Sequence, residues 1–156
     1  MLRVQSAISM RQLGLIRDLF IEYASSLGFD LSFQNFQQEL DELPGAYSPP
    51  NGRLLLGFHG SDPVGCVALR RISEEICEMK RLFVRPQCRG LGLGRALATK
   101  VIGDAREIGY RKMRLDTVPA MRTAITLYLS LGFREIEPYR YNPVEGTKFM
   151  ELDLTN

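Results

Sequence analysis

The sequence predicts a mixed α/β fold in which a mostly antiparallel sheet of six to seven strands is flanked by about four helices. Two observations carry this prediction. Three strand-like runs separated by short turns fill residues 53–84, and a strand, helix and strand passage follows over residues 76–117. Short links join antiparallel neighbours and a helical crossover joins parallel ones, so the pairing should change from antiparallel to parallel in this passage.

The first part of the chain predicts one strand and two helices. Residues 2–7 can form a strand, and Ser9 can cap a helix whose apolar residues recur at helical spacing. Gly28 should end that helix. A second helix is expected over residues 33–43, before a loop rich in proline and glycine.

The middle of the chain predicts most of the sheet. Strands are expected over residues 53–58, 64–72 and 76–84, and again over residues 112–117. Between the last two, apolar residues recur at helical spacing over residues 93–108. These elements form the antiparallel region and the crossover.

The last part predicts one more helix and two strands. Pro119 suits the first turn of the helix, and Gly132 suits the position after its end. Strands are expected over residues 133–136 and 148–152, with a loop over residues 139–143 between them. Since no repeat or linker divides the chain, residues 1–156 are expected to form one domain.

Composition indicates an ordinary globular protein. Hydrophobic residues make up 45% of the 156 residues, charged residues 24%, and the net charge is +2. Such a charge favours neither a nucleic-acid nor a membrane partner. Charged residues interrupt the apolar stretches near the N-terminus, so we expect no signal peptide and a cytoplasmic location.

The cysteines and the histidine argue against several kinds of site. The cysteines at positions 66, 77 and 88 form no CxxC pair, which fits a reducing compartment. The single histidine, His59, lies in a turn-like run and is expected to be an exposed loop residue. One histidine also argues against a histidine-rich zinc site or a Ser-His-Asp triad, and no metal is expected.

A glycine-rich turn is the strongest functional signal. Gly90, Gly92 and Gly94 alternate between a predicted strand and a predicted helix, where backbone N–H groups can face a ligand. The helix N-terminus favours anions, and residues 80–95 contain five basic residues and no acidic one. We therefore expect a ligand that carries phosphates.

Other phosphate-binding motifs fit this turn less well. A Walker loop would continue with lysine and a hydroxyl residue, but Arg95 and Ala96 follow Gly94. Asp116 stands where a dinucleotide fold would bind ribose, yet the third glycine of that fingerprint is absent in both registers. The antiparallel strands upstream also disagree with a dinucleotide fold.

Residues 78–97 resemble the acetyl-CoA-binding motif of the GNAT family of N-acetyltransferases. Arg89, Gly92 and Gly94 match its core, (Q/R)xxGx(G/A), and residues 124–133 resemble the family's AIxLYxxxGF segment. The resemblance covers nearly the whole chain. It implies the GNAT fold, with a sheet that splays between its fourth and fifth strands.

The resemblance implies acetyl-CoA as co-substrate and two groups of cofactor-binding residues. The backbone of Leu82, Phe83 and Val84 would pair with the pantetheine arm. The pyrophosphate would be held by the loop Arg89, Gly90, Leu91, Gly92, Leu93, Gly94 and Arg95. Many members have asparagine where this chain has Met121, so that cofactor contact is expected to differ.

The resemblance also implies candidate catalytic residues. Glu78 and Asp116 stand where two branches of the family carry an acidic residue that can act as base; each could equally have a structural role, and water could serve instead. Tyr128 is the family's candidate for protonating the departing CoA thiolate. The N–H of Val84 would bind the oxyanion.

The sequence predicts an enzyme that transfers acetyl from acetyl-CoA to a primary amine by direct attack in a ternary complex. The amine could belong to a small molecule, a protein lysine or a protein N-terminus. The alternative is a silent module that senses acetyl-CoA or CoA. The sequence identifies neither the acceptor nor the oligomeric state, and a homodimer stays open.

Overall fold

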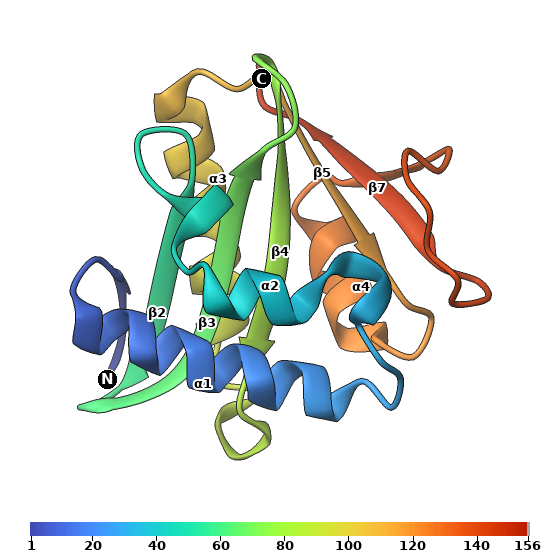
Figure 1. The fold of residues 1–156 in the computed structure, drawn as a ribbon. Coiled ribbons are helices and arrows are strands. Elements are labelled where there is room, and N and C mark those ends of the chain that lie inside the picture. Colours follow the sequence, from blue (N-terminus) through green and yellow to red (C-terminus); the bar gives the residue numbers. More distant parts are fainter. Residues whose placement is uncertain (156) are drawn as a thin grey trace.

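A computed structural model describes residues 1–155 and contains one seven-stranded sheet. The strand order is β1-β2-β3-β4-β5-β7-β6, and only β4 and β5 pair in parallel. The predicted fold class is confirmed, including the change of pairing at the crossover (Figure 1). The strands are β1 (Leu2–Ser6), β2 (Arg53–His59), β3 (Asp62–Arg71), β4 (Ile76–Val84), β5 (Lys112–Thr117), β6 (Arg134–Ile136) and β7 (Lys148–Asp153).

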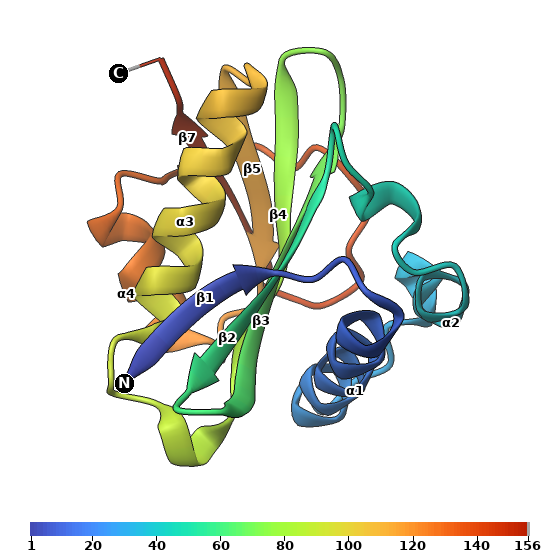
Figure 2. The same cartoon turned by 90° about the vertical axis from the view of Figure 1, so that its left-hand side faces the viewer.

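Four α-helices cover the two faces of the sheet. They are α1 (Met10–Ser26), α2 (Phe36–Asp41), α3 (Leu93–Ile108) and α4 (Arg122–Ser130). Figure 2 shows α1 and α2 on one face, and α3 and α4 on the other. Ser9 caps α1 as predicted: its Oγ accepts from the N–H of Gln12 at 3.1 Å, and Gln12 Oε1 accepts in return from the N–H of Ser9.

The sheet is buried on both sides because its central strands are apolar on both faces. In β2, Leu54 and Leu56 pack with α1, whereas Leu55 packs with α3. This gives one core under each helical layer. The α3 core includes Leu97 and Val101, and it anchors the helix that begins at the glycine-rich turn.

Three predicted elements differ from the structure. Asn35 adopts a left-handed conformation, with φ of 55°, which separates a short 3₁₀ turn from α2 where one helix was expected. Pro119 precedes α4, which begins only at Arg122. His59 ends strand β2 and is exposed there. These boundaries depend on local turns that the apolar pattern does not encode.

A close contact fixes β4 against β3 beside the glycine-rich turn. A Cβ on Gly65 would lie 2.9 Å from the backbone oxygen of Phe83, closer than side chains tolerate. We expect Gly65→Ala to lower the free energy of unfolding by about 1–3 kcal/mol, as overpacking usually does.

Gly103→Ala is the matched control, because this α3 position is exposed and a Cβ would meet nothing within 4 Å. It should raise stability by roughly 0.5–1 kcal/mol through helix propensity. Urea unfolding of both variants measures the two effects. Equal stabilities would mean that β3 and β4 can move apart freely.

Candidate active site

The sheet opens beside the second half of β4. Pairing between β4 and β5 extends only from Ile76 to Glu78, opposite Lys112 to Arg114. Beyond Glu78 the two strands diverge, while β4 stays paired with β3 on its other side. The backbone of residues 82–84 therefore has one edge that no strand of the described chain occupies, and an extended ligand could pair with it.

A bulge accompanies this opening. Arg81 has a positive φ of 62°, and the register with β3 shifts opposite it, between Cys66 and Ala68. Its side chain is buried and binds Glu39 of α2 through Nε at 3.0 Å and Nη2 at 2.7 Å. The ion pair ties α2 to the point where β4 leaves β5.

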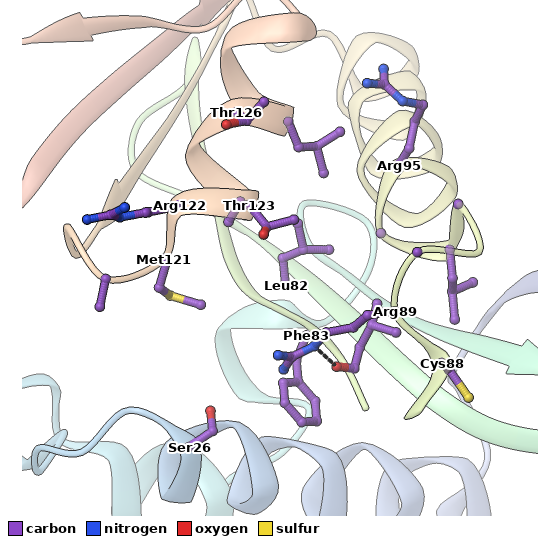
Figure 3. Close-up of a pocket in the computed structure, with 18 of the residues that line it drawn as sticks. Ser26, Leu82, Phe83, Cys88, Arg89, Arg95, Met121, Arg122, Thr123 and Thr126 are labelled. Atoms are coloured by element: carbon purple, nitrogen blue, oxygen red, sulfur yellow. Dashed lines mark hydrogen bonds between the residues drawn. The ribbon is translucent and has the colours of Figure 1, made fainter. Parts of the chain in front are cut away.

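A cleft of about 580 Å³ occupies the opening. Its walls are the end of β4, the glycine-rich turn with the start of α3, and the first turns of α4 (Figure 3). Among the described residues that line it there is no carboxylate, whereas Arg89, Arg95 and Arg122 supply positive charge. The cleft is thus suited to a long anionic ligand with apolar parts.

The glycine-rich turn presents open backbone to this cleft. Gly90 and Gly92 have φ of 82° and 94°, and a Cβ on either would meet no atom within 4 Å. Gly92 caps α3 without a side-chain hydrogen bond, and the first helical bond back to it comes from the N–H of Ala96. The N–H groups before Ala96 are left for a ligand at the positive end of the helix.

The structure brings nearly all of the predicted cofactor residues to the cleft. Leu82, Phe83, Val84, Arg89, Gly90, Gly92, Leu93, Gly94 and Arg95 line it. Leu91 does not; its side chain is exposed to solvent.

The closeness of the basic residues of the 80–95 segment in the sequence suggested one cluster around a single ligand. In the structure their side chains reach different places. Arg89 and Arg95 reach the cleft, where Arg89 Nε donates to the carbonyl of Val84 at 2.9 Å and Arg95 Nη2 donates to Ser130 Oγ at 2.8 Å. Arg81 forms an ion pair with Glu39, and Arg85 Nη2 pairs with Glu22 of α1 at 2.6 Å. Arg81 lies at the bulge within β4, whereas the other three arginines follow the end of that strand at Val84.

Sequence reasoning missed the contribution of α4. Arg122, Thr123, Thr126 and Ser130 line the cleft opposite the glycine-rich turn. The spacing of Thr123, Thr126 and Ser130 by three and four residues on one helix face was the available signal. Met121, just before α4, brings a thioether to the position where the resemblance implied an amide.

A smaller hollow, here called the inner cavity, has a volume of about 40 Å³ and shares Leu82 and Met121 with the cleft. Asp116 and Tyr128 both line it. Asp116 accepts a hydrogen bond from Asn142 Nδ2 at 3.1 Å, and its side chain is 11% exposed. The structure thus brings two of the three predicted catalytic residues together.

Tyr128 is buried between the inner cavity and the core. Burial raises the pKa of its hydroxyl, and Tyr23 and Asp116 add to the effect. Its ring packs on Phe133 at a centroid distance of 5.7 Å. The hydroxyl is therefore held protonated, the form that can donate a proton.

Glu78 does not line the inner cavity. Its side chain is 0% exposed and accepts from Arg70 Nε at 2.7 Å and Tyr139 Oη at 2.6 Å, and it pairs with Arg140. A carboxylate with three such partners has little capacity left to accept a proton from a substrate.

Lys80 also lines the inner cavity and was not predicted as a site residue. Burial, followed by the charge of Arg81, lowers the pKa of its ammonium group to about 7. Its Nζ donates to Gln34 Oε1 at 3.1 Å. Lysines on a strand are usually solvated, so nothing in the sequence distinguished this one.

Within residues 1–155, no group of three or more metal-ligating side chains gathers at this site or elsewhere. None of the helices that the structure describes is long and apolar enough to cross a membrane.

Comparison with solved structures finds the same fold. An acetyltransferase of the GNAT family from Staphylococcus aureus has a TM-score of 0.81 at 20% identity, with 99% of both chains covered. A GNAT family acetyltransferase from Elizabethkingia anophelis, solved with acetyl-CoA bound, has a TM-score of 0.65 at 17% identity over 97% of both chains. The paia N-acetyltransferase from Thermoplasma acidophilum, in complex with coenzyme A, has a TM-score of 0.74 at 15% identity, with 98% of this chain and 99% of that one covered.

Sequence comparison gives closer relatives. An uncharacterized N-acetyltransferase from Schizosaccharomyces pombe is 40% identical over 96% of this chain and 94% of its own length. Another, from Dictyostelium discoideum, is 34% identical over 89% of this chain. The family model for the acetyltransferase (GNAT) family matches residues 15–133. The opened sheet, the glycine-rich turn and these matches agree, and the chain belongs to the acetyltransferase (GNAT) family.

Proposed function

We propose that this protein transfers acetyl from acetyl-CoA to a primary amine by direct attack in a ternary complex. The observation that carries the proposal is the cleft itself, which joins an unpaired strand edge to a helix N-terminus within the opened sheet. Fold neighbours solved with acetyl-CoA or coenzyme A support the choice of ligand. Relatives named as N-acetyltransferases support the choice of reaction.

The cofactor fits this cleft by its chemistry. Its pyrophosphate would lie against the N–H groups of the glycine-rich turn, with Arg89 and Arg95 nearby. Its pantetheine amides would pair with the free edge of residues 82–84. The thioester would then lie near Leu82 and Met121, where the cleft meets the inner cavity.

The amine would reach the thioester from the inner cavity. Attack requires a neutral amine, and Asp116 is the carboxylate that lines this cavity. The N–H of Val84 is the proposed donor to the oxyanion. When the tetrahedral intermediate collapses, the C–S bond breaks and Tyr128 would protonate the sulfur.

The proposal is tested by calorimetry with acetyl-CoA and by release of free CoA thiol with a panel of primary amines. We expect micromolar binding and amine-dependent thiol release, with the acetylated amine detected by mass spectrometry. Binding without thiol release from any amine would favour a sensor of acetyl-CoA. Stabilisation against heat by NAD(P) and not by acetyl-CoA would overturn the cofactor assignment.

The base is tested with Asp116→Asn and Glu78→Gln. If Asp116 removes the proton, Asp116→Asn should lower kcat/KM by about 10²–10⁴-fold, most strongly at low pH, where the amine is most fully protonated. Glu78→Gln should instead leave the shape of the pH–rate profile unchanged.

The free energy of unfolding of Glu78→Gln tests the structural role of Glu78. Glu78→Gln removes the buried charge that the half-buried Arg70 and Arg140 share, so it should destabilise the fold by about 3 kcal/mol. An unchanged profile in Asp116→Asn would mean that water or the substrate itself takes the proton.

A further inference from the structure

A third hollow, here called the outer cavity, adjoins the inner one. It has a volume of about 180 Å³ and shares Gln34 and Lys80 with the inner cavity. Since the inner cavity shares Leu82 and Met121 with the cleft, the three hollows form a series. A molecule bound in the outer cavity could thus extend toward the proposed position of the thioester.

The wall of the outer cavity is formed by two layers of the fold. The 3₁₀ turn Gly45–Tyr47 and the end of α2 close one side, where the chain crosses in front of β3 and β4 (Figure 1). Arg70 of β3, Lys80 of β4 and Arg140 form the other side. The volume is several times the roughly 10–15 Å³ that one water needs.

Positive charge exceeds negative charge in this wall. Arg70 and Arg140 both pair with Glu78, which is itself fully buried, and Arg140 Nε also lies 4.0 Å from Asp116 Oδ2. Glu39 lines the cavity but is bound by both nitrogens of the Arg81 fork. Glu42 lies at the exposed rim, where it accepts from Gln38 Nε2 at 3.0 Å.

Burial and like-charge repulsion destabilise the charged forms of the cations in this wall, and a bound anion would stabilise them. Burial, followed by the charge of Arg70, lowers the pKa of Arg140 to about 10. The pKa of Lys80 is lowered to about 7, first by burial and then by Arg81. Both shifts have the sign expected of crowded, partly desolvated cations.

We propose, on the basis of the function proposed above, that the acceptor is an amine that also carries a carboxylate, bound in the outer cavity by Arg70, Lys80 and Arg140. The amine of the same molecule would lie in the inner cavity beside Asp116. Guanidinium groups recognise a planar carboxylate by charge-assisted hydrogen bonds, which makes a carboxylate the favoured anion.

The substrate test compares glycine, β-alanine, γ-aminobutyrate and L-phenylalanine with their carboxamides. Each pair keeps the size of the molecule and replaces the carboxylate by a neutral amide. We expect kcat/KM for at least one acid to exceed that for its carboxamide by about 10- to 100-fold, the effect expected of hydrogen bonds to a charged group. The amine of an α-carboxamide is less basic than that of the α-amino acid, so a larger fraction of it is neutral at a given pH. A preference for the α-amino acid therefore cannot result from a larger supply of neutral amine.

Ala46→Glu and Ala46→Gln form a matched pair of variants. Ala46 is exposed and lines the outer cavity, so both side chains add the same bulk there and differ by one charge. For the preferred acid, kcat/KM should be about 10-fold or more lower in Ala46→Glu than in Ala46→Gln. Toward the carboxamide, the two variants should be equal.

A binding measurement separates this inference from the proposed function. The acids and carboxamides are titrated by calorimetry into protein saturated with CoA, where no transfer can occur. Acids that bind while carboxamides do not support the carboxylate site, even if no amine is turned over. Turnover of amines with no preference for acids would overturn the carboxylate site and leave the acetyltransferase proposal standing. Equal kcat/KM values of the two Ala46 variants for the preferred acid would do the same. If neither series binds and no amine is turned over, the carboxylate site is overturned as well.

Discussion

Tyr128→Phe is expected to lower kcat by about 10²–10⁴-fold, with little change in the KM for acetyl-CoA. The ring stays, so its packing on Phe133 and in the core is kept. Only the hydroxyl that lines the inner cavity is lost, and with it the proposed proton donor to the sulfur. Single-turnover measurement is the proper readout, because product release or amine binding could hide a change in the chemical step.

Tyr110→Phe is the matched control for loss of a buried hydroxyl. Tyr110 Oη donates to the carbonyl of Asn51 at 2.7 Å, and the residue lines neither the cleft nor the inner cavity. It should cost about 1 kcal/mol of stability without changing the chemical step. A chemical step in Tyr128→Phe as fast as in the parent protein would exclude the acid role and leave Tyr128 as a core residue.

Gly92→Asp is expected to weaken acetyl-CoA binding by more than about 100-fold. The side chain has room, but it places a carboxylate where the phosphates are proposed to lie, and like charges in contact cost several kcal/mol. Calorimetry with acetyl-CoA measures the loss.

Gly92→Ala separates charge from backbone strain. Both substitutions must adopt φ near 94°, which costs a residue with a Cβ about 1–2 kcal/mol. Both should therefore melt at a similar temperature, while only the aspartate should nearly abolish binding. Unchanged affinity in a folded Gly92→Asp protein would remove this turn from the cofactor site.

The sequence by itself determined the class of fold and the location of the cleft that we propose holds the cofactor. Both follow from local patterns: apolar periodicity gave the strands and helices, and three glycines before a helix gave the turn that faces the cleft. Such features are encoded within a few neighbouring residues, because glycine conformation and helix ends are local properties.

Only the tertiary structure decided which charged residues face which hollow. Lys80, Arg81, Arg85 and Arg89 are close in sequence, yet they reach the inner cavity, Glu39, Glu22 and the cleft, respectively. The bulge at Arg81 separates the first two, and Arg85 and Arg89 lie beyond the end of β4 at Val84. Glu78 and Asp116 were equal candidates in the sequence, and their surroundings distinguish them. Glu78 is bound by Arg70, Tyr139 and Arg140, whereas Asp116 lines the inner cavity and lies 4.0 Å from Arg140 Nε. The surroundings of a buried charge come from segments distant in the chain, so its role depends on packing that no local pattern records.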